Sequence, residues 1–560
     1  STNTTGANNS ALGVEALKSN TTGYQNTAVG KQALRNNTTG HNNTAVGDQA
    51  MYSNTTGNGR NVAVGAGSMY TNTTGYQNVG IGYNSLRAHT TGYMNTAVGN
   101  DSLLSVTTGY ENAALGHNAL YFNTANHNTA MGAYAGNSTT TGARNTFIGS
   151  NAGRANTTAS ENTAVGRNAL TSNTTGSDNT AFGMNAMTTT TTGSNNVTVG
   201  RSSMSSNTTG YSNAVVGRNA LLQNTTGKEN TVMGAYAMDA NTTASNNAAF
   251  GYAALGANTT GASNTAVGYE TLLNNTTADN NTAMGFSSLV NNTTGANNTA
   301  VGYKSLRDCV TGGQNAALGY YALINTTASN NTAVGNQAMQ ENTSGTANVA
   351  VGYETMKANT TGIQNVAIGD SAGINQTTAE KNTFVGREAG KTITTGSQNV
   401  IIGSQAGGTE TTSSYMLWLA RDDSQAHNAA VWIYGNSGGA CYQGNNSSSW
   451  STSSDERIKK DIVDSPNGLA KIDALQVRNF NYRTPEEITA EGITGCDATG
   501  LQTGVIAQEI ESVLPKAVTE NESGLKQVNT DPIFWAMVKA IQELSAKNEA
   551  LLTRIEALEG

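Results

Sequence analysis

Residues 26–42 read NTAVGKQALRNNTTGHN, and Asn43 opens the next copy of the same unit. The residue after each Thr-Thr pair, such as Gly23 or Gly40, recurs every 17 residues with a few slips of one residue, and 24 such units run to Gly396. A fixed period of this length is the signature of a repeat architecture. Residues 1–408 are therefore predicted to be a stack of one small structural unit.

The 17-residue unit predicts a short strand, a corner, a second short strand and a second corner. Two helices need more residues than this, and Asn, Gly and Thr favour corners and strands. Each unit has about four apolar positions, so neighbouring coils must share a core. The predicted fold class is mainly β: a parallel β-solenoid shaft of about 24 coils, roughly 115 Å long at about 4.8 Å per coil.

The composition excludes several classes of protein. Only 12% of the 560 residues are charged and the net charge is -8. Low charge argues against a disordered chain, and mild acidity argues against binding to nucleic acid. No apolar run of eighteen residues occurs, so no membrane insertion is expected. Cys309, Cys441 and Cys496 lie far apart without metal-ligand spacing, so neither a metal site nor a cofactor is expected.

Two columns of glycine in the repeat have different meanings. The glycine of the Ala-Val-Gly motif, for example Gly30 or Gly47, is present in all 24 units, which predicts a positive φ or a close backbone contact. The residue after Thr-Thr is sometimes alanine, for example Ala159 and Ala244. This tolerance argues against a left-handed conformation in the second column.

The apolar residues of the unit come as adjacent pairs, Ala28-Val29 and Ala33-Leu34. Neighbours in a strand point to opposite faces, so one face of the coil lines its own interior and the other needs a cover. An apolar stripe along the whole shaft far exceeds what a monomer exposes, which predicts chains side by side, most simply a homotrimer. The unit also resembles the head repeats of trimeric autotransporter adhesins and the shafts of many phage fibres.

The polar columns admit several interpretations. Thr and Asn can face solvent, Asn can stack in ladders, or an unbroken Thr face can order water as in ice-binding proteins. A polysaccharide depolymerase would need two carboxylates about 5–10 Å apart. Acidic residues in the shaft are scattered singly, so no enzymatic site is expected there.

The chain changes character near residue 410, after which all four tryptophans and all four prolines occur. Residues 415–419 and 431–434 are predicted strands, with a turn at 421–423 and a loop from 435 to 454. The segment 409–453 is expected to close the end of the solenoid, because repeat stacks need terminal caps. Its exposed aromatic residues could instead stack on sugars.

The last 107 residues carry ordered motifs. They begin with SDERIKKDI at 454–462 and continue with GLAKIDAL at 468–475, FNY at 480–482, GVIAQEI at 504–510 and VLP at 513–515. This order resembles the self-cleaving C-terminal intramolecular chaperone of phage tailspikes and tail fibres. The resemblance implies that Ser454 attacks the Ser453-Ser454 peptide bond with assistance from Lys459. A serine needs such a base, and a lysine can serve when its pKa is lowered.

The C-terminal tail predicts association of chains through a helix, 533–558. Its apolar residues step by 4 and 3 in three heptads; taken with Leu at a and Ile at d, the pattern predicts three or four strands. Asp531 is expected to cap this helix and Pro532 to occupy its first position. The seam consists of Met537, Ile541, Leu544, Asn548, Leu551, Ile555 and Leu558.

Together these patterns and resemblances predict three domains: a shaft at 1–408, a cap at 409–453 and an α+β chaperone at 454–560. The expected product is a trimeric phage tail fibre in the virion that binds a host receptor, most simply a glycan. The alternative is an uncleaved trimeric adhesin of the bacterial surface. Depolymerase and ice-binding activities are less favoured alternatives.

Overall fold

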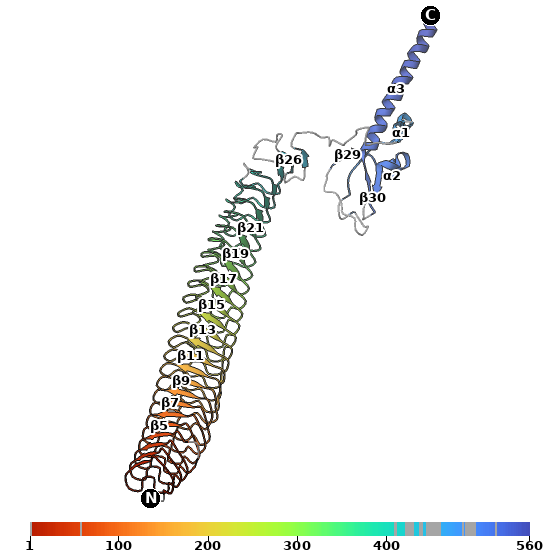
Figure 1. The fold of residues 1–560 in the computed structure, drawn as a ribbon. Helices are drawn as coiled ribbons and strands as arrows, with labels where there is room; N and C mark the ends of the chain where they lie inside the picture. Colours follow the sequence, from red (N-terminus) through yellow and green to blue (C-terminus); the bar gives the residue numbers. More distant parts are fainter. Residues whose placement is uncertain are drawn as a thin grey trace. The chain divides into compact units, whose positions relative to one another are not determined.

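The computed structural model describes residues 3–56, 59–407, 411–420, 431–435, 441–443, 461–466, 468–483, 487, 500–520 and 524–560. The chain divides into two compact units, Ser1–Ser449 and Trp450–Gly560. The first unit is a long β-solenoid, and the second is a small α+β unit with a long C-terminal helix (Figure 1). Among the described residues, no helix has the length and apolarity that a bilayer crossing requires.

The shaft contains one three-residue strand per coil, in 24 coils, which confirms the predicted solenoid. Each strand pairs in parallel with the strand of the next coil without offset, as Thr27, Ala28 and Val29 do with Thr44, Ala45 and Val46. The strands are β1 Ser10–Leu12, β2 Thr27–Val29, β3 Thr44–Val46, β4 Val62–Val64, β5 Val79–Ile81, β6 Thr96–Val98, β7 Ala113–Leu115, β8 Thr129–Met131, β9 Thr146–Ile148, β10 Thr163–Val165, β11 Thr180–Phe182, β12 Val197–Val199, β13 Ala214–Val216, β14 Thr231–Met233, β15 Ala248–Phe250, β16 Thr265–Val267, β17 Thr282–Met284, β18 Thr299–Val301, β19 Ala316–Leu318, β20 Thr332–Val334, β21 Val349–Val351, β22 Val366–Ile368, β23 Thr383–Val385 and β24 Val400–Ile402.

The second strand predicted in each unit is absent from the described coils; turns replace it. In the coil of β2, Gln25, Gln32 and Leu34 have φ values of 56°, 58° and 49°. A non-glycine residue in this left-handed region costs about 1–2 kcal/mol. The N–H of Leu34 donates to the carbonyl of Ala50 in the next coil at 3.0 Å, so the coil stack offsets this cost.

The shaft core contains both members of the second apolar pair. Ala28 is fully buried and Val29 only partly, as alternation in a strand predicts. Ala33 and Leu34 are both fully buried, so alternation is the wrong rule there. The left-handed backbone at Leu34 redirects its side chain, because side chains alternate between two faces only along an extended backbone.

The glycine of the Ala-Val-Gly motif is required by both reasons foreseen from the sequence. Gly30 has a φ of 131°, and a Cβ built on it lies 2.4 Å from the carbonyl oxygen of Gly47 in the next coil. Gly23, after Thr-Thr, is not among the positive-φ residues. The second column thus lacks the left-handed backbone of the first, although a Cβ on Gly23 would also lie 2.4 Å from a carbonyl oxygen, that of Gly40.

The polar core of the shaft is an asparagine ladder. In the coil of β13, the Asn213 Oδ1 accepts the backbone N–H of Asn230 in the next coil at 3.0 Å. Its Nδ2 donates to the carbonyl of Gly227, across the coil, at 3.0 Å. The equivalent position is Asn in all 24 coils, from Asn9 to Asn399. Of the interpretations of the Asn columns, a stacked ladder is therefore correct here, and it is buried.

A second asparagine column runs beside the first but is interrupted. Asn37 is fully buried and donates from Nδ2 to the Oδ1 of Asn20 at 2.7 Å and to the carbonyl of Gly40 at 3.0 Å. Other residue types occupy the column in eight coils: His89, Val106, Thr139, Thr190, Cys309, Thr326, Gln376 and Ile393. Burial lowers the pKa of His89 to about 4 and raises the pKa of Cys309 to about 11.

Bulky residues enter the core only where neighbouring coils make room. Phe147 occupies the position of Ala28 and is fully buried. The positions of Leu34 in its own and the preceding coil are Gly153 and Gly136, where a Cβ would lie 2.3 Å and 2.7 Å from the Phe147 ring. Phe384, Gly373 and Gly390 repeat this exchange. Core volume is thus conserved across coils, as close packing requires.

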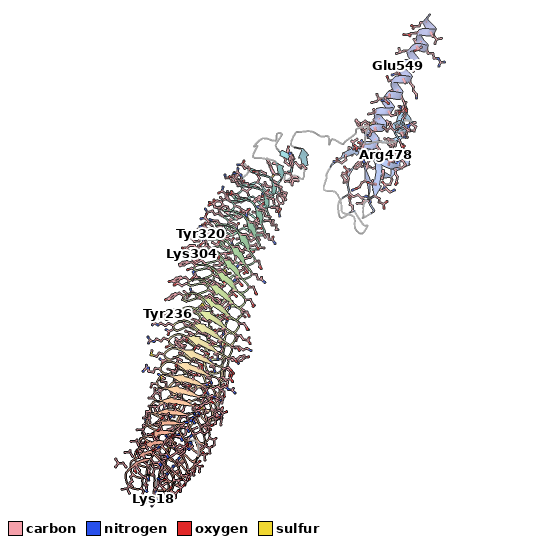
Figure 2. All side chains as sticks on the ribbon, in the orientation of Figure 1. Lys18, Tyr236, Lys304, Tyr320, Arg478 and Glu549 are labelled. Carbon is pink, nitrogen blue, oxygen red and sulfur yellow. The ribbon has the colours of Figure 1, made fainter. Side chains whose placement is uncertain are left out.

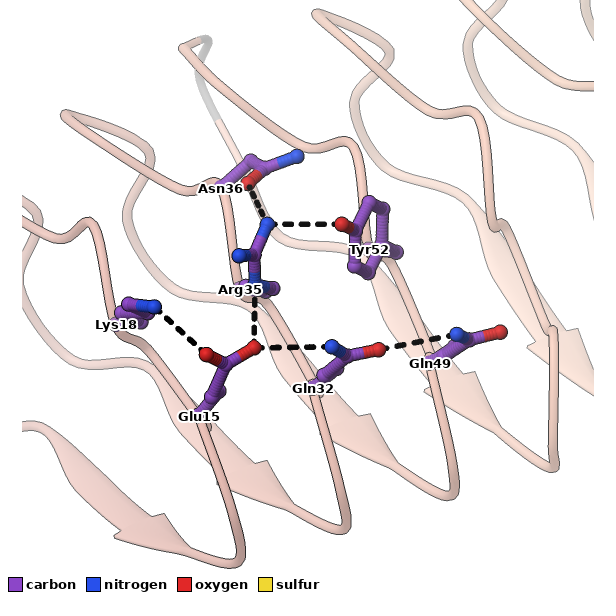
Figure 3. Close-up of polar contacts among 7 residues, drawn as sticks. All are labelled: Glu15, Lys18, Gln32, Arg35, Asn36, Gln49 and Tyr52. Atoms are coloured by element: carbon purple, nitrogen blue, oxygen red, sulfur yellow. Dashed lines mark hydrogen bonds and ion pairs between the residues drawn. The ribbon is translucent and has the colours of Figure 1, made fainter.

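Polar contacts also connect the outer surfaces of the first coils (Figure 3). The Glu15 carboxylate accepts hydrogen bonds from Lys18 at 2.6 Å, from Arg35 at 2.7 Å and from Gln32 at 2.9 Å. Gln49 donates to Gln32 at 3.0 Å in turn. The hydrogen bond from Lys18 is the largest cause of a pKa of about 2 for Glu15.

The end of the solenoid continues further than expected. β25, Leu417–Ala420, pairs in parallel with β24 at the same spacing of 17 residues. β26, Val431–Gly435, then pairs antiparallel with β25, and β27, Cys441–Gln443, pairs antiparallel with β26. Both predicted strands are present, and β27 lies where only a loop was predicted. Residues 421–423 lie outside the described residues.

Candidate functional site

The described residues of the C-terminal unit form three α-helices and two antiparallel pairs of strands. In chain order they are α1 Gly468–Ala474, β28 Arg478–Phe480, β29 Gln502–Gly504, α2 Ala507–Val513, the 3-10 turn η3 Pro515–Ala517, β30 Val518–Glu520, β31 Lys526–Val528 and α3 Thr530–Glu559. β28 pairs antiparallel with β29, and β30 with β31. The motifs identified in the sequence therefore coincide with these elements.

A small apolar core connects α2, η3 and the first part of α3. Ile510, Leu514, Ala517 and Ala536 are buried in it, and Ile472 and Val518 are among the partly buried residues that pack against it. α3 is 30 residues long, but its two buried residues, Ala536 and Ala540, both lie in its first half. The core consequently holds only the start of the helix.

A carboxylate on α3 holds the start of α1. The two oxygens of Glu543 accept the backbone N–H groups of Gly468 and Leu469, each at 2.8 Å. These two hydrogen bonds are the main reason for a lowered pKa of Glu543. A Cβ on Gly468 would lie 2.4 Å from the backbone nitrogen of Ala540, so only glycine permits this approach. The ordered sequence motifs include both Gly468 and Glu543, in the stretch 540–544, but no sequence signal paired the two.

An exposed ion pair and an apolar groove complete the described surface of the unit. Arg478 on β28 donates to both carboxylate oxygens of Glu509 on α2, at 2.8 Å and 3.1 Å. A groove of about 550 Å³ lies between η3 and α3. It is lined by Ser465, Pro466, Lys471, Val513, Leu514, Pro515, Lys516, Pro532, Trp535 and Ala536.

The helix α3 begins earlier than predicted. Asn529, not Asp531, is the N-cap: its backbone is extended, and its Oδ1 accepts the N–H of Asp531 at 3.0 Å. Pro532 is then the third helical residue rather than the first. A proline is tolerated in this first turn because its missing N–H has no partner within the helix.

The predicted seam of α3 is exposed in the single chain. Ile541 is 67% exposed and Leu558 is 81% exposed. The other seam residues, Met537, Leu544, Asn548, Leu551 and Ile555, are exposed as well. Among the described residues, no other part of the chain covers this apolar row of α3.

The heptad assignment of the seam needs correction. In a heptad, position d comes three residues after position a. The step of three from Ile541 to Leu544 therefore places Ile541 at a and Leu544 at d. Ile555 and Leu551 follow the same assignment. Ile at a with Leu at d favours two strands, not three or four. The heptad pattern therefore supports association of α3 but not a trimer.

The predicted cleavage residues Ser453, Ser454 and Lys459 lie outside the described residues. Their geometry is not part of the structure, and the Ser454-Lys459 pair stays a prediction. Within the described part of the chain, no group of three His, Cys, Asp or Glu side chains is arranged to bind a metal ion.

Comparison with protein families identifies the C-terminal unit. Residues 454–519 match the Peptidase_S74 model, described as a chaperone of endosialidase. The match begins at Ser454 and includes α1, α2 and both strands of the first hairpin. The family implies an autoproteolytic chaperone and homotrimer assembly. The chain thus carries a C-terminal chaperone domain of the Peptidase_S74 family behind a long β-solenoid, an arrangement typical of phage tail fibres and tailspikes.

Proposed function

We propose that the protein is a trimeric phage tail fibre whose shaft binds the host surface and whose C-terminal domain aligns three chains before it cleaves itself off. The observation that carries the proposal is the family match beginning at Ser454, directly after the long solenoid. In this proposal the domains are a shaft at 1–408, a cap at 409–453 and a chaperone at 454–560. Parallel solenoids close long loops and fold slowly, so a C-terminal nucleus that fixes the register of three chains speeds assembly.

The proposed reaction is attack of the Ser454 hydroxyl on the carbonyl of the Ser453-Ser454 bond. Lys459 takes the hydroxyl proton and delivers a proton to the leaving nitrogen. The intramolecular geometry supplies a high effective concentration of the nucleophile. The ester formed is then hydrolysed by water, which completes one turnover and separates the shaft from the chaperone.

An apolar stripe on the shaft supports association of chains. The third residue of every shaft strand is apolar, from Leu12 on β1 to Ile402 on β24. The residue is more than half exposed in some coils, with Phe182 at 54% and Met233 at 51%. A monomer rarely exposes an apolar patch of this extent. Three shafts packed along this stripe, with the α3 seams joined, would cover both apolar surfaces.

Denaturing gel electrophoresis with intact mass measurement tests the cleavage. Wild type is expected to release a fragment of roughly 11 kDa, the mass of 107 average residues. Ser454→Ala and Lys459→Ala are expected to stay at full length, whereas the neighbouring controls Ser453→Ala and Lys460→Ala still cleave. A full-length band for wild type would contradict autoproteolysis and favour the uncleaved surface adhesin.

Sedimentation of the full-length Ser454→Ala protein tests the number of chains. Three chains are expected, and Leu551→Asp should reduce their association because a charge is buried in the seam. Ala550→Asp, one residue away on the outer side of α3, is the matched control. A dimer, the state that the heptad pattern favours, would overturn the trimer.

A further inference from the structure

One surface column of the shaft combines stacked aromatic rings with unpaired cations. The column consists of the residue that follows the Ala-Val-Gly glycine in each coil. In five consecutive coils this residue is aromatic, and all five side chains are between 37% and 47% exposed. They are Tyr252, Tyr269, Phe286, Tyr303 and Tyr320, here called the aromatic ladder.

The aromatic ladder is a regular stack along the shaft. Successive ring centroids are 5.2–5.3 Å apart and the ring planes differ by 5–14°. Because each ring face covers the next, the ladder presents ring edges and phenolic hydroxyls to solvent. Tyr236, Lys304 and Tyr320 lie along one margin of the shaft (Figure 2). The result is a straight row of amphipathic groups with one member per coil.

In three of the five coils before the aromatic ladder the same column carries an arginine; the other two have Met184 and Ala235. Arg167, Arg201 and Arg218 occupy it and are exposed. Within the described residues none of these three guanidinium groups forms an ion pair; Arg218 lies over the ring of Tyr236 at 5.6 Å. The next residue in each coil adds Lys304 as a cation and Glu270 as a carboxylate. Cations thus predominate on this column although the chain carries a net charge of -8.

We propose that this column binds a linear acidic polysaccharide that lies along the shaft. The inference rests on the proposed function and names the class of host-surface molecule. Arginine pairs with carboxylates through two parallel hydrogen bonds, and tyrosine offers an apolar edge with a polar tip to a sugar. One ring per coil also matches a ligand that repeats along its length, because a sugar in an extended chain advances by a similar distance.

The chemistry of the column favours a glycan over a second copy of this chain. The apolar strand stripe, with one Val, Ile, Leu, Met or Phe per coil, is the surface suited to another shaft. The ladder column instead presents phenolic hydroxyls and guanidinium groups, which can pair with the hydroxyls and carboxylates of an acidic sugar. An acidic sugar chain satisfies both halves of the column at once.

Titration of the full-length fibre with a linear oligogalacturonate tests the proposal, with its methyl ester as the uncharged probe. The acidic probe is expected to bind more tightly than the ester, and the affinity should fall with salt. Arg201→Ala/Arg218→Ala and Tyr269→Ala/Phe286→Ala/Tyr303→Ala should each weaken binding roughly tenfold or more. The matched control is Tyr76→Ala/Tyr93→Ala/Tyr110→Ala, a second stack with centroids 5.2 Å and 4.8 Å apart, which should bind as wild type does.

Three results would overturn the proposal: no binding of the acidic probe, equal binding of the ester, or equal losses in the control stack. A loss of chain association in the ladder variant, with probe affinity unchanged, would assign the column to another copy of this chain. Adsorption of wild type and the ladder variant to host cells tests the proposed site separately from the proposed host-binding function. Equal adsorption of both rejects this site but keeps the host-binding function, whereas no adsorption of wild type rejects that function.

Discussion

The shaft and the C-terminal unit solve the same problem of stability in opposite ways. In the shaft, buried asparagines find partners in the coils before and after their own, as Asn213 does with Asn196 and Asn230. In the C-terminal unit, a small core holds the start of α3 and leaves its seam exposed. The shaft is therefore built from near-neighbour contacts, whereas the last helix leaves an apolar row exposed. This difference fits the proposed fibre with a separable assembly domain.

The largest effect is expected from the glycine that ends each shaft strand. Gly200 has a φ of 144°, and a Cβ on it would lie 2.3 Å from the carbonyl oxygen of Gly217. Gly200→Ala should cost more than about 3 kcal/mol, since strain and a backbone clash combine. Gly193→Ala is the control, because a Cβ there would also lie 2.3 Å from a carbonyl oxygen, that of Gly210, but its column lacks positive φ and accepts alanine at Ala159 and Ala244. Hydrogen exchange of the flanking coils measures the loss of local stability in both variants. Equal losses would show that crowding, not a positive φ, makes glycine necessary.

The next largest loss of stability is expected when the exchange of side-chain volume at Phe147 is disturbed. Phe147→Ala leaves a cavity and is expected to cost about 3–5 kcal/mol locally. Adding Gly153→Leu should recover part of this loss, because Gly153 has a φ of 57°, close to the 49° at which Leu34 is accommodated. Local hydrogen exchange is the readout, and Gly153→Leu alone should be destabilising. Absence of rescue in the double variant would contradict volume conservation between coils.

The two asparagine columns should differ in sensitivity. Asn213→Ala leaves the N–H of Asn230 unpaired in the core, at a cost of about 1–3 kcal/mol, whereas the carbonyl of Gly227 keeps the hydrogen bond from Asn224 at 3.0 Å. Asn207→Thr lies in the interrupted column, which already contains Thr190, and should cost about 1 kcal/mol or less. Thermal unfolding of both full-length variants compares them. Similar midpoints would mean that the unbroken column is no more essential than the interrupted one.

The smallest effect on local stability is expected from a change of pH, and the contact of Glu543 in the C-terminal unit should respond differently from the asparagine ladder of the shaft. The pKa of Glu543 is lowered from 4.5 in the folded chain. The stability that its ionised carboxylate contributes is therefore present above that value and is lost as pH falls through the folded pKa. The amides of Gly468 and Leu469 should therefore exchange faster in acid, after correction for intrinsic rates. Glu543→Gln should remove this pH dependence. The Asn213 side chain hydrogen-bonds only to backbone groups and to neighbouring asparagines, so a matching acid response there would break the comparison.

Much of this architecture follows from the sequence alone. A period of 17 residues, a glycine present in every unit and adjacent pairs of apolar residues are local properties, and they determine the solenoid, its coil number and the conformation at Gly30. The ordered motifs from Ser454 onward likewise determine the family of the C-terminal unit. The Asn column is also visible in the sequence, although its burial is not.

Only the tertiary structure decided where the repeat departs from the side-chain alternation of a β-strand. Leu34 and Gln32 have left-handed backbones that no propensity assigns to leucine or glutamine, because hydrogen bonds to adjacent coils stabilise them. The exchange of Phe147 with Gly136 and Gly153 and the contact of Glu543 with Gly468 join residues from different coils or elements. Side chains many residues apart become neighbours only when the chain folds, so such pairs are set by packing rather than by local pattern.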